Sequence, residues 1–164
     1  MDSRCIGLLI ALVVLVTLSG LFSATETAYT GFSLVRMRRF AKNKKSARMA
    51  FRLSADYNRI LTTLLIADNI VNIASATIGT LIFTSLIGAE LGPTVSTVVL
   101  TIVLLIFGEI TPKILAKRVP ETFACVAAYP LLVCTYLLLP LVWLFGVWKK
   151  FIFCLFGLGK KQPR

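Results

Sequence analysis

Four long apolar blocks, separated by short polar or basic segments, set the pattern of the chain. They lie at about residues 6–30, 60–87, 94–116 and 123–158. About 20 apolar residues in a helix cross the hydrocarbon core of a bilayer. We therefore predict an all-α integral membrane protein with three membrane-spanning helices, at about 6–30, 60–87 and 94–116. Residues 1–164 are expected to form a single transmembrane domain.

The fourth block contains two prolines, Pro130 and Pro140, and has basic residues at both ends. Proline lacks an N–H group and its ring clashes with the preceding helical turn, so these residues predict pieces of about ten residues, too short to cross. We expect interfacial helices over about 121–157, with Trp143 and Trp148 as anchors at the cytoplasmic surface. A re-entrant hairpin is the alternative.

Basic residues concentrate between the first and second blocks. Eight of the 18 Lys and Arg residues lie within residues 36–52: Arg36, Arg38, Arg39, Lys42, Lys44, Lys45, Arg48 and Arg52. In a soluble protein this cluster would indicate nucleic-acid binding, but between two spans it marks a cytoplasmic loop. We expect no nucleic-acid partner, and a multi-pass protein of the plasma membrane with its N-terminus outside and its C-terminus in the cytoplasm.

The same basic segment alternates its cations with apolar side chains, among them Met37, Phe40 and Met49. This pattern favours a second interfacial helix over about 36–52, lying on the anionic lipids of the inner leaflet. A solvated basic loop is the alternative. Together with residues 121–157, this helix would form a juxtamembrane belt around the three spans.

Polar side chains at membrane depth are costly and normally face the protein interior. On the first span, Ser19, Ser23, Glu26 and Thr30 fall within an arc of roughly 60°. Hydroxyl groups can bond back to their own helix, which explains Ser and Thr but leaves the carboxylate of Glu26 without a partner. We therefore treat Ser23 and Glu26 as candidate site residues.

The second span carries an acid and two carboxamides, Asp68, Asn69 and Asn72, followed by Ser75. Asparagine can hydrogen-bond between membrane helices without any further function. Three such groups within five residues nevertheless favour a site, and we assign Asn69 and Asn72 to it. Asp68 is expected to lie off the centre of the asparagine face.

The third span ends in the stretch FGEITPKILAKR, from Phe107 to Arg118. Pro112 cannot donate to the carbonyl four residues earlier, which belongs to Gly108. A freed carbonyl beside the carboxylate of Glu109, in a helix broken at membrane depth, is typical of cation sites in transporters. A simple proline kink with a solvated Glu109 is the alternative.

All of these candidate ligands are oxygen atoms. The chain has no histidine, and its four cysteines are separate and lie in apolar surroundings. Hydroxyl, amide, carboxylate and carbonyl oxygens suit Mg²⁺, Ca²⁺ or Na⁺ and argue against zinc and copper. Without histidine or a nucleophile–base pair, we do not expect an enzyme.

Three motifs in order resemble those of the CorC/CNNM magnesium transporters. FSATETAYTGFS is similar to the first-helix motif of that family, LIADNIVNIASA to its asparagine-rich second-helix motif, and FGEITPKILAKR to its Gly-Glu-x-x-Pro-Lys motif. The resemblance covers roughly residues 5–145. One departure is that the family usually reads Gly-Asn-Asn where this chain has Ala67, Asp68 and Asn69, which bears on ion selectivity.

The resemblance implies a homodimer with three spans, a juxtamembrane belt and Mg²⁺ in an inward-open cavity. It also implies Mg²⁺ export, exchanged in some accounts for Na⁺. Family proteins usually continue into a cytosolic pair of CBS modules that bind nucleotide, which these 164 residues lack. We therefore expect either the transmembrane part of a longer protein or a short homologue, and no nucleotide regulation within these residues.

Carried over by the resemblance, the site residues are Ser23, Glu26, Asn69, Asn72, Gly108 and Glu109, with Pro112 shaping the site. We expect a dehydrated Mg²⁺ ion between the three helices, at about 2.0–2.1 Å from its protein oxygens. The leading function is Mg²⁺ transport. The alternative is a membrane Mg²⁺ sensor or scaffold that binds the ion without moving it.

Overall fold

The computed structural model describes residues 3–156, and every regular element in that range is a helix. The predicted all-α membrane fold is confirmed. In chain order the elements are α1 (Ser3–Gly31), α2 (Leu34–Asn43), α3 (Lys45–Ser54), α4 (Tyr57–Ile87), α5 (Gly92–Val103), the π-helix η1 (Leu104–Ile110), α6 (Thr111–Arg118), α7 (Pro120–Leu137) and α8 (Leu139–Leu155).

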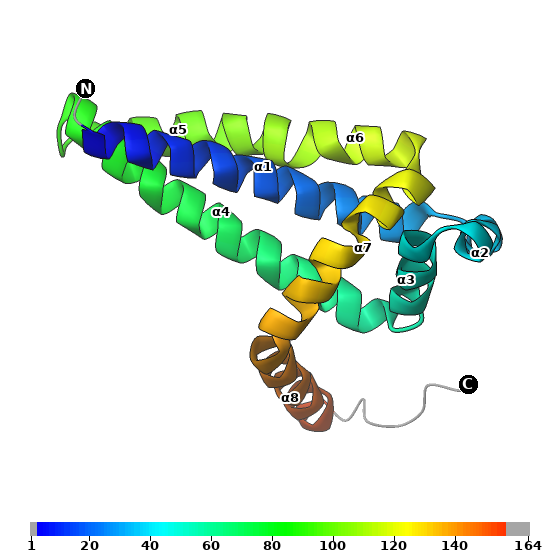
Figure 1. Ribbon diagram of the computed structural model, residues 1–164. Coiled ribbons are helices and arrows are strands. Elements are labelled where there is room, and N and C mark those ends of the chain that lie inside the picture. The colour runs from blue at the N-terminus through cyan, green and yellow to red at the C-terminus, as the bar shows by residue number, and fades with distance from the viewer. Residues whose placement is uncertain (1–2, 157–164) are drawn as a thin grey trace.

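Three long rods lie side by side: α1, α4 and the continuous run of α5, η1 and α6 (Figure 1). They contain the three predicted spans. Their outer faces keep many large apolar side chains exposed, as expected for helices that face lipid. The described N-terminal end lies at one end of the bundle, and α2 and α3 lie at the other.

Four helices in the described range are long and apolar enough to cross a membrane: the three rods and α7. The prediction that only the three rods cross the membrane is therefore not confirmed, because α7 also qualifies. It stays a prediction. In Figure 1, α7 runs obliquely across the bundle from the end of α6, and α8 continues beyond it.

The prediction that prolines cut the fourth block into pieces of ten residues is wrong. Pro130 lies inside an α7 of 18 residues, and Pro140 lies in the first turn of α8, which has 17 residues. A first-turn proline costs nothing, because that N–H has no helical partner. The interior Pro130 is tolerated where Ala124, Ala128 and Leu131 of α7 are buried against the bundle.

The predicted single helix over 36–52 is also wrong, because the segment forms two helices. Lys44 adopts extended dihedral angles (φ −125°, ψ 127°) between α2 and α3. Asn43 precedes it, and asparagine favours helix ends over helix interiors. Met37 of α2 and Ala47 and Ala50 of α3 are fully buried, so both helices pack on the protein rather than lying only on lipid.

The buried apolar cluster lies at this end of the bundle and takes residues from α1, α2, α3, α4, α6 and α7. Seven of its twelve members are alanines: Ala24, Ala28, Ala47, Ala50, Ala116, Ala124 and Ala128. Small side chains let helices approach closely, which is how membrane helices pack without a hydrophobic driving force. This cluster holds the three rods together at the end of the bundle where α2 and α3 lie. It thereby fixes the positions of the polar residues of the rods.

Candidate cation-binding site

Oxygen atoms from α1 and α4 meet at Ser19. The Ser19 Oγ atom lies 2.9 Å from Oδ1 of Asp68 and 3.0 Å from Oδ1 of Asn72. The Asn72 amide also donates to Oδ2 of Asp68, at 3.3 Å. Ser19 is buried, whereas Asp68 and Asn72 are half-buried, so the group lies inside the bundle but within reach of solvent.

With Asp68 ionised, a count of the protons shows why this group favours a cation. The Ser19 hydroxyl has one proton, which it can donate either to Asp68 or to Asn72. If the hydroxyl donates to one of these two oxygen atoms, the other lies about 3 Å from the Ser19 Oγ atom with no proton between them. Oxygens that crowd together with too few protons repel one another, and a bound cation removes that repulsion.

The π-helix η1 supplies the third side of the site. The Thr111 N–H donates to the Ile106 carbonyl, five residues earlier, and the first carbonyl used by α6 is that of Ile110. The only backbone amides left to donate to the carbonyls of residues 107, 108 and 109 are therefore those of residues 112 and 113. Pro112 has no N–H, so at least two of these three carbonyls lack a helical donor.

This register change refines the prediction of a single freed carbonyl at Gly108. The break begins before Pro112, because the helix takes up an extra residue over Leu104–Ile110. Such π-helical turns are frequent at functional sites. The result is a wider break, in which up to three consecutive carbonyls compete for the amide of Lys113.

Two glycines bring α1 directly against this break. A Cβ atom on Gly108 would lie 3.0 Å from Ser19 Oγ, and one on Gly20 would lie 3.1 Å from the Phe107 carbonyl oxygen. Both distances are tighter than ordinary contacts, so an added Cβ atom at either position would require its neighbour to move by a few tenths of an ångström. The glycines thus set the distance between the Ser19 hydroxyl and the carbonyls of η1.

A cavity of about 240 Å³ opens between the three rods at this level. It is lined by Ser19, Asp68, Asn72, Thr101, Leu104, Leu105 and Glu109. Of the predicted site residues, Asn72 and Glu109 line it directly, and Gly108 contacts Ser19 at its edge. No three acidic, histidine or cysteine side chains of the described residues converge on one point, so hydroxyl, amide and carbonyl oxygens must complete any ligand set here.

The other three predicted residues lie elsewhere. Ser23 is buried one turn further along α1 and does not line this cavity. Asn69 is exposed, and its amide donates to the Leu65 carbonyl of its own helix at 2.7 Å. Glu26 lies two turns from Ser19 and contacts Lys113, with Oε2 to Nζ at 3.8 Å.

Two residues that the sequence analysis left out are central to the cavity. Ser19 belongs to the predicted polar arc of the first span, but only the packing of α4 shows that it is the member that contacts Asp68 and Asn72. The expectation that Asp68 lies off the centre was wrong, because the inward face follows the i, i+4 pair Asp68 and Asn72 and leaves Asn69 outside.

Lys113 was not among the predicted site residues, yet it is part of this region. Its Nζ atom lies 3.1 Å from Oε1 of Glu109 and 3.8 Å from Oε2 of Glu26. The i, i+4 spacing of Glu109 and Lys113 is a sequence signal for the first contact. The second joins α6 to α1 and follows only from the fold.

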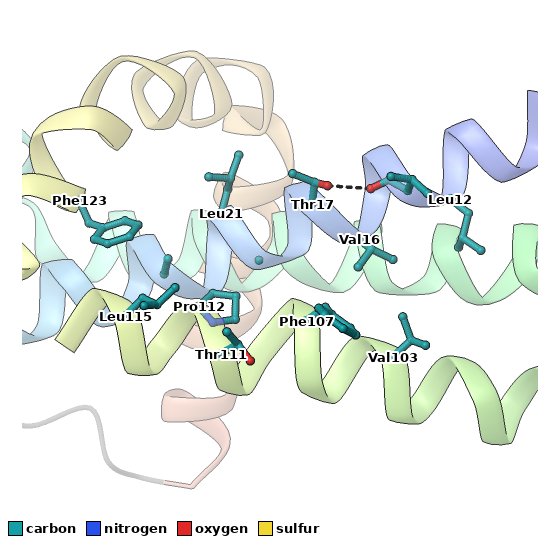
Figure 2. Close-up of a pocket in the computed structure, with 13 residues that line it drawn as sticks. Leu12, Val16, Thr17, Leu21, Val103, Phe107, Thr111, Pro112, Leu115 and Phe123 are labelled. Carbon is teal, nitrogen blue, oxygen red and sulfur yellow. Dashed lines mark hydrogen bonds between the residues drawn. The ribbon is translucent and has the colours of Figure 1, made fainter. Parts of the chain in front are cut away.

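A larger cavity, of about 510 Å³, lies between α1 and the third rod (Figure 2). Its walls are almost entirely apolar, with Leu12, Val16, Val103, Phe107 and Leu115 among them. The hydroxyl of Thr17 donates a hydrogen bond of 2.8 Å to the Val13 carbonyl of its own helix (Figure 2). No charged or amide side chain lines this cavity, so cavity size alone does not locate a cation site.

Comparison with known proteins identifies the chain as a helical membrane domain of a known family. The cyclin M transmembrane N-terminal domain (CNNM) family matches residues 9–164. The UPF0053 inner membrane protein YfjD of Escherichia coli is 33% identical over 142 residues, which are 86% of this chain and 33% of that protein. A UPF0053 protein of Haemophilus influenzae is 32% identical over 152 residues, 92% of this chain and 36% of its own length.

A DUF21 domain-containing protein of Arabidopsis thaliana, described as chloroplastic, is 32% identical over 158 residues, 96% of this chain and 24% of its own. The chain therefore spans about a quarter to a third of the length of these curated relatives. The family match runs over residues 9–164, a range in which all three polar motifs of this chain lie. This chain belongs to the CorC/CNNM family and corresponds to the transmembrane domain of that family.

Proposed function

We propose that this membrane domain transports a divalent cation, with Mg²⁺ as its cargo. Support comes from family membership and from an all-oxygen cavity between three membrane helices. Mg²⁺ prefers hard oxygen ligands at about 2.0–2.1 Å in an octahedral arrangement. Hydroxyl, carboxylate, amide and carbonyl oxygens are all within or beside this cavity.

The observation that carries the proposal is the contact of Ser19 with both Asp68 and Asn72, beside Glu109. Oxygens from α1 and α4 approach to about 3 Å with too few protons to satisfy them. On the third rod, Glu109 and the carbonyls released around Pro112 complete the ring. Each rod thus contributes at least one ligand, so a relative movement of the rods would open or close the site.

In this proposal the ligands are Ser19, Asp68, Asn72 and Glu109, with a carbonyl of η1. Of the residues carried over from the family, Ser23 and Gly108 lie next to this set, and Glu26 lies near the C-terminal end of α1, beside Lys113. Asn69 reaches the site only if α4 rotates, because its side chain faces outward here. Export of Mg²⁺, with Na⁺ moving the other way, is the direction we propose.

The membrane setting is part of the same proposal. We place the domain in the plasma membrane as a homodimer, with the N-terminus outside and the basic segment of α2 and α3 on the anionic inner leaflet. The cavity then lies between the membrane centre and the cytoplasmic alanine cluster. An ion could enter from the cytoplasmic side, past Glu26 and Lys113.

A flux measurement tests the proposal. The 164-residue chain in liposomes loaded with a Mg²⁺-sensitive dye should move Mg²⁺ at a rate well above that of empty liposomes, and a Na⁺ gradient should change that rate. Binding of Mg²⁺ without flux would instead support a membrane sensor or scaffold, because the same ligands serve both functions. Absence of both binding and flux would overturn the proposal.

A further inference from the structure

Lys113 has an unusual position for a lysine that only marks the cytoplasmic side of a span. Its ammonium group lies between two carboxylates from different helices, 3.1 Å from Glu109 and 3.8 Å from Glu26. Glu109 also lines the oxygen cavity, next to Asp68. The ammonium group is therefore a cation of the protein itself, held at the edge of the proposed cation site.

We infer that the Lys113 ammonium is a tethered counter-cation, which pairs with Glu109 in the empty site and is displaced towards Glu26 when a cation from solution binds. The inference rests on the proposed function and adds how the site releases its cargo. The lysine side chain is long and flexible, with four carbons between Cα and the ammonium group, so it can exchange partners without movement of the helix.

Charge balance supports this role. Glu26, Asp68 and Glu109 are three carboxylates served by a single ammonium group, so in their ionised forms they carry two uncompensated negative charges. One divalent cation neutralises them. If Lys113 stayed on Glu109 as the ion arrived, two cations would share one carboxylate, and repulsion would favour the move to Glu26.

The exposure of these groups makes the exchange feasible. The side chain of Lys113 is 32% exposed, that of Glu26 is 34% exposed and that of Glu109 is 49% exposed. Ion pairs that water can reach contribute little net stability, since solvent screens them. A pair of this kind breaks readily, whereas a fully buried one would lock Glu109 and block the site.

The inference predicts competition, so removal of the ammonium group should strengthen cation binding. In Lys113→Met, the dissociation constant for Mg²⁺ should fall about tenfold. The constant for Na⁺ should fall about threefold, because the Coulomb energy scales with the charge of the ion and a monovalent cation gains half as much in logarithmic terms. A role in packing alone would not produce this dependence on ionic charge.

The test is titration calorimetry of the full chain in lipid nanodiscs, with MgCl₂ and separately with NaCl. The matched control is Lys117→Met, which changes the net charge equally, one turn further along α6 at an exposed position. Lys113→Arg should stay close to the wild type, because it keeps the charge. Lys113→Gln provides a second neutral variant if Lys113→Met does not fold, as judged by circular dichroism.

The outcomes separate this inference from the proposed function. Wild-type binding of Mg²⁺ combined with weaker or unchanged binding in both neutral variants would overturn the tethered counter-cation and leave the proposed function standing. Equal strengthening in Lys117→Met would also overturn it, since a general surface-charge effect would then suffice. Absence of Mg²⁺ binding in the wild type would overturn both.

Discussion

Two helices of this protein contain an interior or near-interior proline, and the two prolines have opposite consequences. In the third rod, the helix changes register over Leu104–Ile110 before Pro112, and carbonyls lose their donors. In α7, the helix continues through Pro130 for 18 residues. One residue type thus accompanies a polar break in one helix and leaves the other continuous.

The neighbours explain the difference. Before Pro112 stand Gly108 and Glu109, and Ser19 of α1 packs against Gly108, so polar atoms from a second helix lie next to the released carbonyls. Before Pro130 stand Ala124 and Ala128, both fully buried in the apolar cluster. Tight packing of small side chains holds α7 in one helical path. The proline position alone therefore does not predict a site, whereas a proline beside polar residues of another helix does.

The largest effect on Mg²⁺ affinity is expected in the polar region before Pro112. Glu109→Gln keeps the shape of the side chain and removes its charge, so Mg²⁺ affinity should fall roughly 100-fold or more, which is about 2.7 kcal/mol. Calorimetry with MgCl₂ measures it. Glu90→Gln, in the exposed turn between α4 and α5, removes the same charge and should bind as the wild type does. Equal losses in both variants would contradict a site at Glu109.

The corresponding test for the apolar cluster before Pro130 is the substitution Ala128→Leu. Ala128 is fully buried two residues before Pro130, so the larger side chain should overpack the cluster and lower stability by about 1–3 kcal/mol. Mg²⁺ affinity should change less than twofold. Thermal unfolding in mild detergent gives the stability, with the exposed Val126→Leu as control. A large loss of affinity at unchanged stability would show that α7 shapes the site after all.

A smaller effect is expected for Pro112→Ala. The new N–H can bond to one of the carbonyls of residues 107–109, so it competes with the cation and should weaken Mg²⁺ binding roughly tenfold. No side-chain ligand is removed. Thr111→Ala, a change at the adjacent exposed position, serves as the control. If Pro112→Ala binds Mg²⁺ as tightly as the wild type, the released carbonyls are not ligands, even if Glu109 is.

The smallest effect is expected for Pro130→Ala. Because α7 is already continuous, the substitution adds at most one helical hydrogen bond, and stability should rise by no more than about 1 kcal/mol. Mg²⁺ affinity should not change. The same unfolding and calorimetric measurements apply. A strong change in binding would mean that Pro130, like Pro112, belongs to a break that serves the site.

Sequence reasoning went furthest where the signal is local. Runs of about 20 apolar residues predicted the three rods, and the Gly-Glu-x-x-Pro-Lys stretch predicted a helix broken near Gly108. Helix periodicity placed Ser19 on the polar arc of the first span. Periodicity alone did not decide between Asn69 and Asp68, because two residues 100° apart on a helix can each face inward until a neighbour is packed against one of them.

What the sequence determined by itself is the inventory: an all-helical membrane domain, an all-oxygen set of candidate ligands and a strongly basic segment between the first two spans. The tertiary structure decided which oxygens meet. It turned Ser19 towards Asp68 and Asn72, left Asn69 outside, and placed Lys113 between carboxylates of two helices. The physical reason is that helix rotation is set by packing between rods, here by the close approach of Ser19 to Gly108, and no residue pattern within a single helix contains that contact.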